Sequence, residues 1–161
     1  MKKILCASLL LTTAYLHAEQ PSLDINKLYV GANLTHNVID SPFGGRDLDA
    51  NGVGLFAGYE FDNDMDQINT YLEVGYSQTD DFFDNEDING LWVSGLLQKT
   101  LPEIDPRLSV LARLGLDFGD DDGLFLGAGG AFQLTPHFSM RAEYINKDAT
   151  TVYQLGGVIH F

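Results

Sequence analysis

The stretch LSVLARLGLDF, residues 108–118, alternates between two kinds of side chain along almost its whole length. One set is apolar: Leu108, Val110, Ala112, Leu114, Leu116 and Phe118. The intervening set is small, polar or charged: Ser109, Arg113, Gly115 and Asp117. Successive side chains of a β-strand point to opposite faces, so this pattern predicts a strand with one apolar face and one polar face.

Seven other stretches show the same period of two, with the pattern least regular in the fourth of the eight. They are residues 28–35, 53–61, 68–77, 89–99, 124–134, 138–147 and 153–161. The chain has 161 residues with 17 Gly, ten Phe and seven Tyr, a composition that favours strands and tight turns. We therefore predict an all-β domain of eight strands.

The links between these stretches differ in length and charge. Those after the second, fourth and sixth are short turns, at residues 63–66, 100–106 and 135–137. Those after the first, third and fifth are longer or more acidic, at 39–51, 79–87 and 117–123, and residues 146–150 close the seventh hairpin. Short turns on one side and long polar loops on the other are typical of an outer-membrane barrel, with the short turns in the periplasm.

Charged residues decide between a soluble and a membrane barrel. A soluble eight-stranded barrel would turn its apolar face inward and its charges outward. Here five charges share the polar face with Gly, Ser, Asn and Gln: Glu60, Glu73, Arg113, Arg141 and Glu143. They suit a lumen in which opposite charges pair, so the sequence predicts an eight-stranded antiparallel up-and-down transmembrane β-barrel.

The strand directions predict how deep in the barrel each of these charges lies. With the third, fifth and seventh strands running outward, Glu73, Arg113 and Glu143 fall at mid-barrel, and Arg141 and Glu60 fall nearer the periplasm. The network is then either a plug that ties the strands together or a gate for small solutes. Since side chains nearly fill an eight-stranded barrel, we favour the plug.

Aromatic residues near the strand ends support the membrane assignment, because outer-membrane barrels carry aromatic girdles at both interfaces. The predicted girdle residues are Tyr59, Phe61, Tyr76, Phe118, Phe132, Phe138, Tyr144, Tyr153 and Phe161.

Residues 1–18 read as a secretory signal peptide, which leaves residues 19–161 as the barrel domain. Lys2 and Lys3 precede an apolar run that is too short to span a bilayer as a helix. Cleavage after Ala18 fits best, with residues 12–14 as an alternative. The only cysteine, Cys6, lies in this segment, so we expect no disulfide in the mature chain.

The formal net charge of −14 argues against nucleic acid as a partner. Two acidic clusters suggest calcium but lack the ordered alternation of an EF-hand loop. We interpret them as solvated loops, with bridging of divalent cations to lipopolysaccharide as an alternative, and we predict no metal or cofactor. The clusters are Asp80, Asp81, Asp84, Glu86 and Asp87, and Asp117, Asp120, Asp121 and Asp122.

Three histidines are candidates for catalytic groups. His137 and Ser139 lie two residues apart, as in some outer-membrane lipases, but the strand directions place them at the periplasmic end rather than at the outer leaflet. His36 and His160 have no acidic partner or nucleophile at an evident spacing. The sequence therefore predicts no catalytic residue and a protein that is not an enzyme.

The chain resembles the small outer-membrane β-barrels of the OmpA-like and OmpX-like type. The resemblance rests on LYVGANL at 28–34, on LTPHFSMRAEY at 134–144 and on the C-terminal QLGGVIHF. In that last segment Gln154, Gly156, Ile159 and Phe161 match the signal read by the barrel assembly machinery, with Ile159 aliphatic where an aromatic is common.

This resemblance implies an integral outer-membrane protein in contact with lipid and lipopolysaccharide, and we expect a monomer. The role expected is structural, in envelope integrity or surface contact. A narrow, porin-like channel gated by the lumen charges is the alternative.

Overall fold

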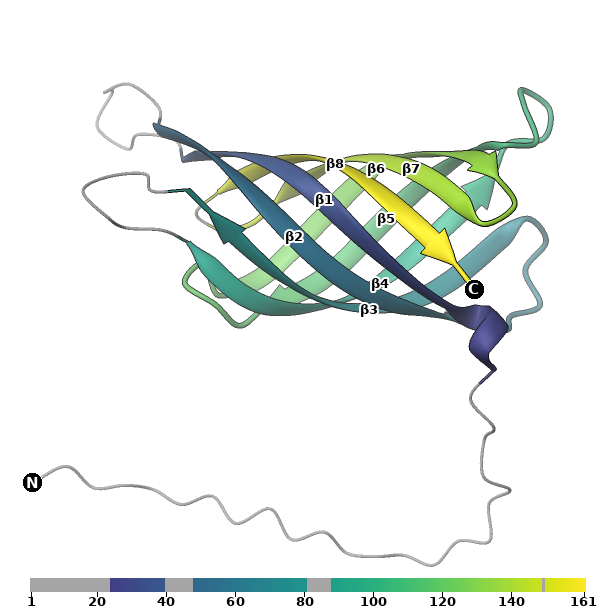
Figure 1. The fold of residues 1–161 in the computed structure, drawn as a ribbon, viewed down its shortest axis with the longest axis horizontal. Helices are drawn as coiled ribbons and strands as arrows, with labels where there is room; N and C mark the ends of the chain where they lie inside the picture. Colours follow the sequence, from purple (N-terminus) through teal and green to yellow (C-terminus); the bar gives the residue numbers. More distant parts are fainter. Residues whose placement is uncertain (1–23, 40–47, 81–87, 149) are drawn as a thin grey trace, which may run out of the picture.

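The computed structural model of the chain describes residues 24–39, 48–80, 88–148 and 150–161. A short 3-10 helix, η1 (Ile25–Lys27), leads into β1 (Leu28–Ile39) (Figure 1). Seven strands follow: β2 (Leu48–Phe61), β3 (Ile68–Thr79), β4 (Asn89–Thr100), β5 (Leu108–Asp117), β6 (Gly123–Thr135), β7 (Phe138–Asn146) and β8 (Thr151–His160). In the described part of the chain no helix is long and apolar enough to cross a membrane.

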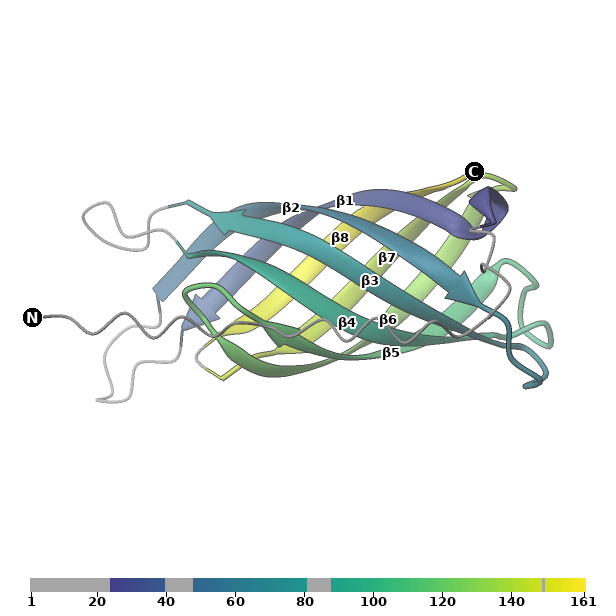
Figure 2. The same ribbon diagram turned by 90° about the horizontal axis from the view of Figure 1, so that it is seen from below.

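The strands form a closed antiparallel barrel in which each strand pairs with its neighbours in sequence. The barrel closes between β1 and β8, in a register that sets Tyr29 opposite His160. Beyond β8, the backbone N–H of Phe161 donates to the carbonyl oxygen of Leu28 (3.3 Å). Figure 2 shows the strands tilted against the long axis of the barrel. The predicted eight-stranded up-and-down barrel is confirmed.

The two ends of the barrel differ. At one end, the turn end, β1 begins, β8 finishes and three turns connect β2–β3, β4–β5 and β6–β7. At the other, the loop end, lie the four remaining connections. The first of these is shorter than the predicted 39–51, because β1 and β2 stay paired up to Ile39 and Leu48. There the Asn37 side-chain amide donates to the carbonyl oxygen of Ala50 (3.2 Å), which extends the hairpin.

Side-chain hydrogen bonds to the backbone shape the turns at the turn end. Asn63 accepts from the N–H of Met65 (2.8 Å), and Asp105 accepts from the N–H of Arg107 (2.8 Å), two residues on in each case. Such contacts reverse the chain locally without a sheet partner. Hydrogen bonds from the Arg107 side chain and backbone hold the pKa of the Asp105 carboxyl below its usual value.

The outer surface of the barrel is apolar along the middle of the strands. Leu34 and Leu55, for example, each expose 67% of their surface, which only a hydrocarbon surround makes favourable. Aromatic residues lie toward both rims as predicted, and two pairs are in edge-to-face contact. Tyr59 and Phe61 lie near the turn end (5.2 Å between ring centroids), and Tyr144 and Tyr153 near the loop end (5.4 Å).

The interior is more apolar than the predicted polar lumen. One buried apolar layer lies toward the turn end and comprises Tyr29, Phe56, Tyr71, Leu96, Leu111, Ala131 and Val158. A second cluster toward the loop end comprises Phe125, Ile145 and Val152, and Trp92 packs against both. The barrel thus has a packed core like that of a soluble protein, although its outer face is apolar as well.

Candidate functional site

Four charged side chains meet in the middle of the lumen and are called the charge belt here: Glu73, Arg113, Arg141 and Glu143. Glu73 comes from β3, Arg113 from β5, and Arg141 and Glu143 from β7. These three strands run in the same direction, so alternate positions along them reach the lumen at similar depth. All four residues are buried, which at this depth requires pairing.

Glu73 is the most enclosed member, with none of its side chain exposed. Its Oε2 accepts from Nη1 of Arg113 (2.5 Å), and its Oε1 accepts from Nη1 of Arg141 (2.8 Å) and from the Tyr29 hydroxyl (2.6 Å). Three donors, two of them cationic, therefore replace the water that this carboxylate loses on burial.

Arg113 makes a two-pronged contact with Glu143. Its Nε and Nη2 donate to the two carboxylate oxygens (2.8 and 3.0 Å), and its Nη1 also reaches the Ser94 hydroxyl (2.8 Å). Gln154 donates to Glu143 (2.9 Å) and accepts from Asn33 (2.9 Å). The network therefore links β1, β3, β4, β5, β7 and β8.

Arg141 is held by aromatic rings as well as by Glu73. Its guanidinium carbon lies 4.8 Å from the centre of the Phe56 ring and 5.9 Å from that of Tyr29, which is cation–π geometry. Its Nη2 is buried without a hydrogen-bond partner among the described residues. Two cations and two anions make the belt electrically balanced.

Glycines on the strands beside the belt give its members room. A Cβ atom at Gly58 of β2 would lie 2.1 Å from the Tyr29 ring, and one at Gly129 of β6 would lie 3.0 Å from the side chain of Glu143. Each glycine is the direct register partner of the side chain it accommodates. At Gly58 the close approach of the Tyr29 ring to the barrel wall requires glycine. At Gly129 the nearest obstacle is backbone, because a Cβ atom there would lie 2.2 Å from the carbonyl oxygen of Ala142.

Glu60, grouped with the belt by sequence reasoning, lies apart from it. It is the register partner of Tyr71 near the turn end of β2 and takes part in no ion pair within the described residues. Sequence reasoning missed Tyr29, Ser94 and Asn33 as belt partners. Their alternate positions on the lumen face were the only available signal.

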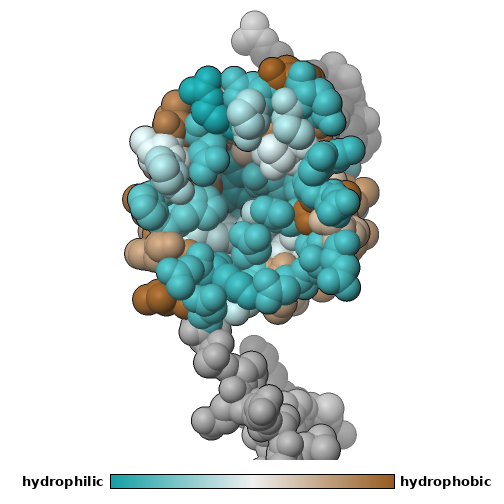
Figure 3. Space-filling view, turned by 90° about the vertical axis from the view of Figure 1, so that its right-hand side faces the viewer, coloured by the Kyte–Doolittle hydropathy of each residue, from teal (hydrophilic) through white to brown (hydrophobic). Residues whose placement is uncertain are grey.

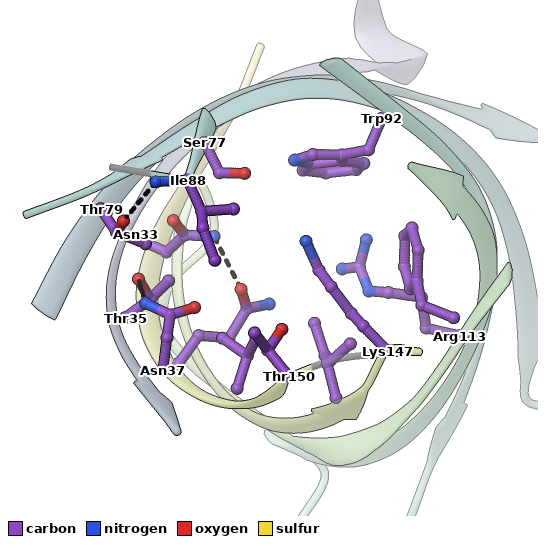
Figure 4. Close-up of a pocket in the computed structure, with 14 residues that line it drawn as sticks. Asn33, Thr35, Asn37, Ser77, Thr79, Ile88, Trp92, Arg113, Lys147 and Thr150 are labelled. Carbon is purple, nitrogen blue, oxygen red and sulfur yellow. Dashed lines mark hydrogen bonds between the residues drawn. The ribbon is translucent and has the colours of Figure 1, made fainter. Parts of the chain in front are cut away.

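A narrow cavity of about 40 Å³ lies between the belt and the loop end (Figure 4). Trp92 and Lys147 project into it from different walls, and Arg113 forms part of its base. The Lys147 ammonium pairs with Asp117 (2.5 Å), which ties the ends of β5 and β7 together. This volume holds a water molecule rather than a larger solute.

The acidic residues of the β5–β6 connection act as hydrogen-bond acceptors for neighbouring segments. Asp120 accepts from the N–H of Asn89 (3.0 Å), and Asp121 accepts from the Thr150 hydroxyl (2.5 Å). No group of three or more metal-ligating side chains occurs within the described residues. Most of the other acidic cluster, and the predicted signal peptide, lie outside those residues.

The histidines occupy separate places. His137 and Ser139 line the lumen at the turn end together with His160, whose ring lies 5.3 Å from that of Tyr29. His36 lies on the outer face of β1, with Nδ1 3.1 Å from the Asn51 side-chain oxygen. The geometry thus places the pair considered for lipase chemistry inside the barrel.

The predicted assembly-signal residues divide between the two faces of β8. Ile159 and Phe161 expose about half of their surface on the outside of the barrel, at 51% and 55%. Gln154 and Gly156 face the lumen, where Gln154 is bonded to the belt. The polar residue of the motif therefore has a structural partner in this chain.

A closed antiparallel barrel with an apolar exterior, aromatic rims and a buried charge network is a transmembrane β-barrel of the outer-membrane class. The profile of the outer membrane protein beta-barrel domain family matches residues 4–156, and the chain belongs to this family. The family indicates an outer-membrane location. The comparison with curated protein sequences gave no significant match.

Several solved barrels share the fold. Neisserial surface protein A is 15% identical, over 84% of this chain and 97% of its own, with a TM-score of 0.56. Ail, the attachment invasion locus protein of Yersinia pestis, is 18% identical over 83% of this chain and 97% of its own, with a TM-score of 0.57. A de novo designed transmembrane β-barrel is 18% identical over 86% of this chain and 98% of its own, with a TM-score of 0.59. At these identities the likeness concerns the fold alone.

Proposed function

We propose that this protein is a monomeric, non-enzymatic barrel of the outer membrane whose lumen is closed by the charge belt. Its role is structural or in surface contact, through the segments at the loop end. The observation that carries the proposal is the burial and mutual pairing of Glu73, Arg113, Arg141 and Glu143 in the middle of the lumen.

The energetics of the belt favour a plug over a gate. Opening a path would break several charge-assisted hydrogen bonds, each worth about 1.5–3 kcal/mol, and would separate charges in a confined space. The apolar layer on the turn-end side would have to move as well, since Leu96 and Val158 are almost fully buried within it. Thermal motion at the rims does not supply the free energy needed to break these hydrogen bonds and move the apolar layer.

A narrow channel is the second candidate, because a cavity approaches the belt from each side. The loop-end cavity touches Arg113, and a larger cavity at the turn end touches Tyr71, while the two share no lining residue. A rearrangement of both the belt and the apolar layer would join them. The two candidates therefore differ in whether the folded barrel conducts ions.

The absence of enzymatic activity is part of the proposal. His137 and Ser139 open toward the turn end, which we assign to the periplasm. Attack on lipids of the outer leaflet needs a nucleophile on the opposite rim and on the outer face. At the loop end, we propose that Tyr144, Tyr153 and the neighbouring rim residues contact lipid and lipopolysaccharide.

Replacing residues 81–87 with an Asn-Gly turn is expected to leave the barrel folded and to reduce surface attachment or envelope resistance. Below this segment Thr79 and Ile88 already close the hairpin, because the N–H of Thr79 donates to the Ile88 carbonyl oxygen and the N–H of Ile88 donates to the Thr79 hydroxyl (both 2.9 Å). The measurements are heat-dependent gel mobility for folding, and detergent resistance and adhesion of cells. Unchanged resistance and adhesion would remove the main support for the surface role.

Replacing Phe161 with glutamine is expected to reduce the folded barrel in cells severalfold while leaving refolding into detergent nearly unchanged. Phe161 presents its ring outside the barrel after the last strand pair, where the assembly machinery would read it. The matched control is Phe61→Gln, an equally placed aromatic at the turn end of β2, 46% exposed. An equal loss of folded protein in both variants would assign Phe161 to the girdle rather than to the signal.

A further inference from the structure

The lumen at the turn end is a polar cup that the proposed scaffold role leaves unused. It has a volume of about 320 Å³ and opens at the rim where β1 begins and β8 finishes. Figure 3 looks into this end of the molecule and shows a hollow with a hydrophilic lining. The volume is within the range of small-ligand sites.

Pairs of neutral hydrogen-bonding side chains form the wall of the cup. Asn69 and Gln98 are register partners on β3 and β4, and Gln133 and Ser139 are partners on β6 and β7. The hydroxyl groups of Thr100 and Ser109 lie 3.4 Å apart between β4 and β5. Each amide offers both donors and an acceptor, so the wall presents both kinds of group from several directions.

The floor of the cup is aromatic and apolar. It is the layer that contains Tyr71, Leu96 and Ala131, and it separates the cup from the charge belt. The Asn69 amide donates to the Tyr71 hydroxyl (3.1 Å), which fixes that side chain at the base. A solute that enters here meets a closed base and must leave by the same rim.

Charge in the cup is sparse. Arg107 at the rim is paired with Asp105 (3.1 Å) and lies over the Phe132 ring, so it is already engaged. Glu60 is the carboxylate of the lining, and it disfavours anionic solutes. The mainly polar wall disfavours hydrocarbon, because entry would strip its amides and hydroxyl groups of water without replacing the hydrogen bonds.

We propose that this cup binds a sugar ring that enters from the periplasmic side. A pyranose carries many hydroxyl groups that both donate and accept, which matches the mixed wall, and its C–H face can rest on the apolar floor. Glu60, near the turn end of β2, adds a strong acceptor for hydroxyl groups. The site holds one ring of a periplasmic glycan or a free saccharide, and the two sources share this chemistry.

The test uses the mature barrel folded in dodecylphosphocholine micelles, which carry no sugar headgroup, and follows amide signals by NMR. N,N′-diacetylchitobiose represents the amino-sugar glycans and maltose represents the hexose sugars. We expect saturable shifts at the turn end for at least one of them, with a Kd near the millimolar range. Selective binding of N,N′-diacetylchitobiose would favour an amino-sugar glycan as the ligand, and selective binding of maltose would favour a free hexose saccharide.

Gln98→Leu is expected to raise the Kd by about fivefold or more, because it removes a donor and an acceptor from the wall. Ser139→Leu, which fills the cup, provides a second variant if the first does not fold. The matched control is Thr35→Val, a lumen substitution on the loop-end side of the belt. The proposal is overturned if neither sugar gives saturable shifts below about 50 mM, or if Gln98→Leu and Ser139→Leu both bind like the unmodified barrel.

Discussion

Replacing Arg113 with methionine is expected to lower the free energy of unfolding of the barrel by about 3–5 kcal/mol. The substitution keeps the apolar stem but removes the cation that faces both Glu73 and Glu143 (2.5 and 2.8 Å). It leaves Glu143 buried with Gln154 as its remaining hydrogen-bond donor in the network. The measurement is urea-induced unfolding of the barrel in lipid vesicles.

A second substitution separates charge imbalance from loss of packing. Combining Arg113→Met with Glu143→Gln restores a balanced belt, with Arg141 opposite Glu73 (2.8 Å). We expect the double variant to be less destabilised than the sum of the single changes by more than about 1 kcal/mol, because these residues are in direct contact. Additive effects would mean that the ion pair contributes little. Arg107→Met, at an exposed pair, serves as the control with little expected change.

Replacing Gly58 with alanine is expected to destabilise the barrel by about 1–3 kcal/mol, although it adds only one methyl group. The new Cβ would lie 2.1 Å from the Tyr29 ring and 2.4 Å from its hydroxyl oxygen. Tyr29 would have to move away from Glu73, to which it donates at 2.6 Å, and from Tyr71, which it contacts edge to face. Urea-induced unfolding in lipid vesicles measures this change in the free energy of unfolding.

The chain contains a matched control for this substitution. Gly95 lies on the outer face of β4, and a Cβ atom there would have nothing within 4 Å. Gly95→Ala is therefore expected to change stability by less than about 0.5 kcal/mol. If both variants lost the same stability, a general effect of alanine in these strands would explain the result, and the close contact between Tyr29 and Gly58 would not.

Alternation along single strands was enough to predict the barrel and most of the belt. Arg113 stands between Ala112 and Leu114, so its face is opposite to theirs whatever the neighbouring strands do. Counting from the strand ends then placed Glu73 and Glu143 at the depth of Arg113. Glu60 obeys the same alternation, but it lies close to the end of β2, which puts it beside the turn-end cup instead of the belt.

The packed interior was harder to predict because it depends on register. Trp92 and Phe125 point inward, and each ring covers a glycine on the neighbouring strand, Gly75 and Gly115 respectively, which leaves room for it. A single strand pattern does not reveal which residue will stand opposite. The alternation put Tyr29, Phe56, Tyr71 and Ala131 on the lumen side, but it assigned no face to Leu96, Leu111 and Val158, which complete the apolar layer.

The central claim is that the charge belt closes the lumen, and single-channel recording tests it most directly. A barrel made of residues 19–161 would be refolded, checked by heat-dependent gel mobility and inserted into a planar bilayer beside Arg113→Ala. We predict a folded barrel without discrete current steps. Regular steps from the unmodified barrel, changed in size by Arg113→Ala, would contradict the plug and establish a narrow pore governed by the belt.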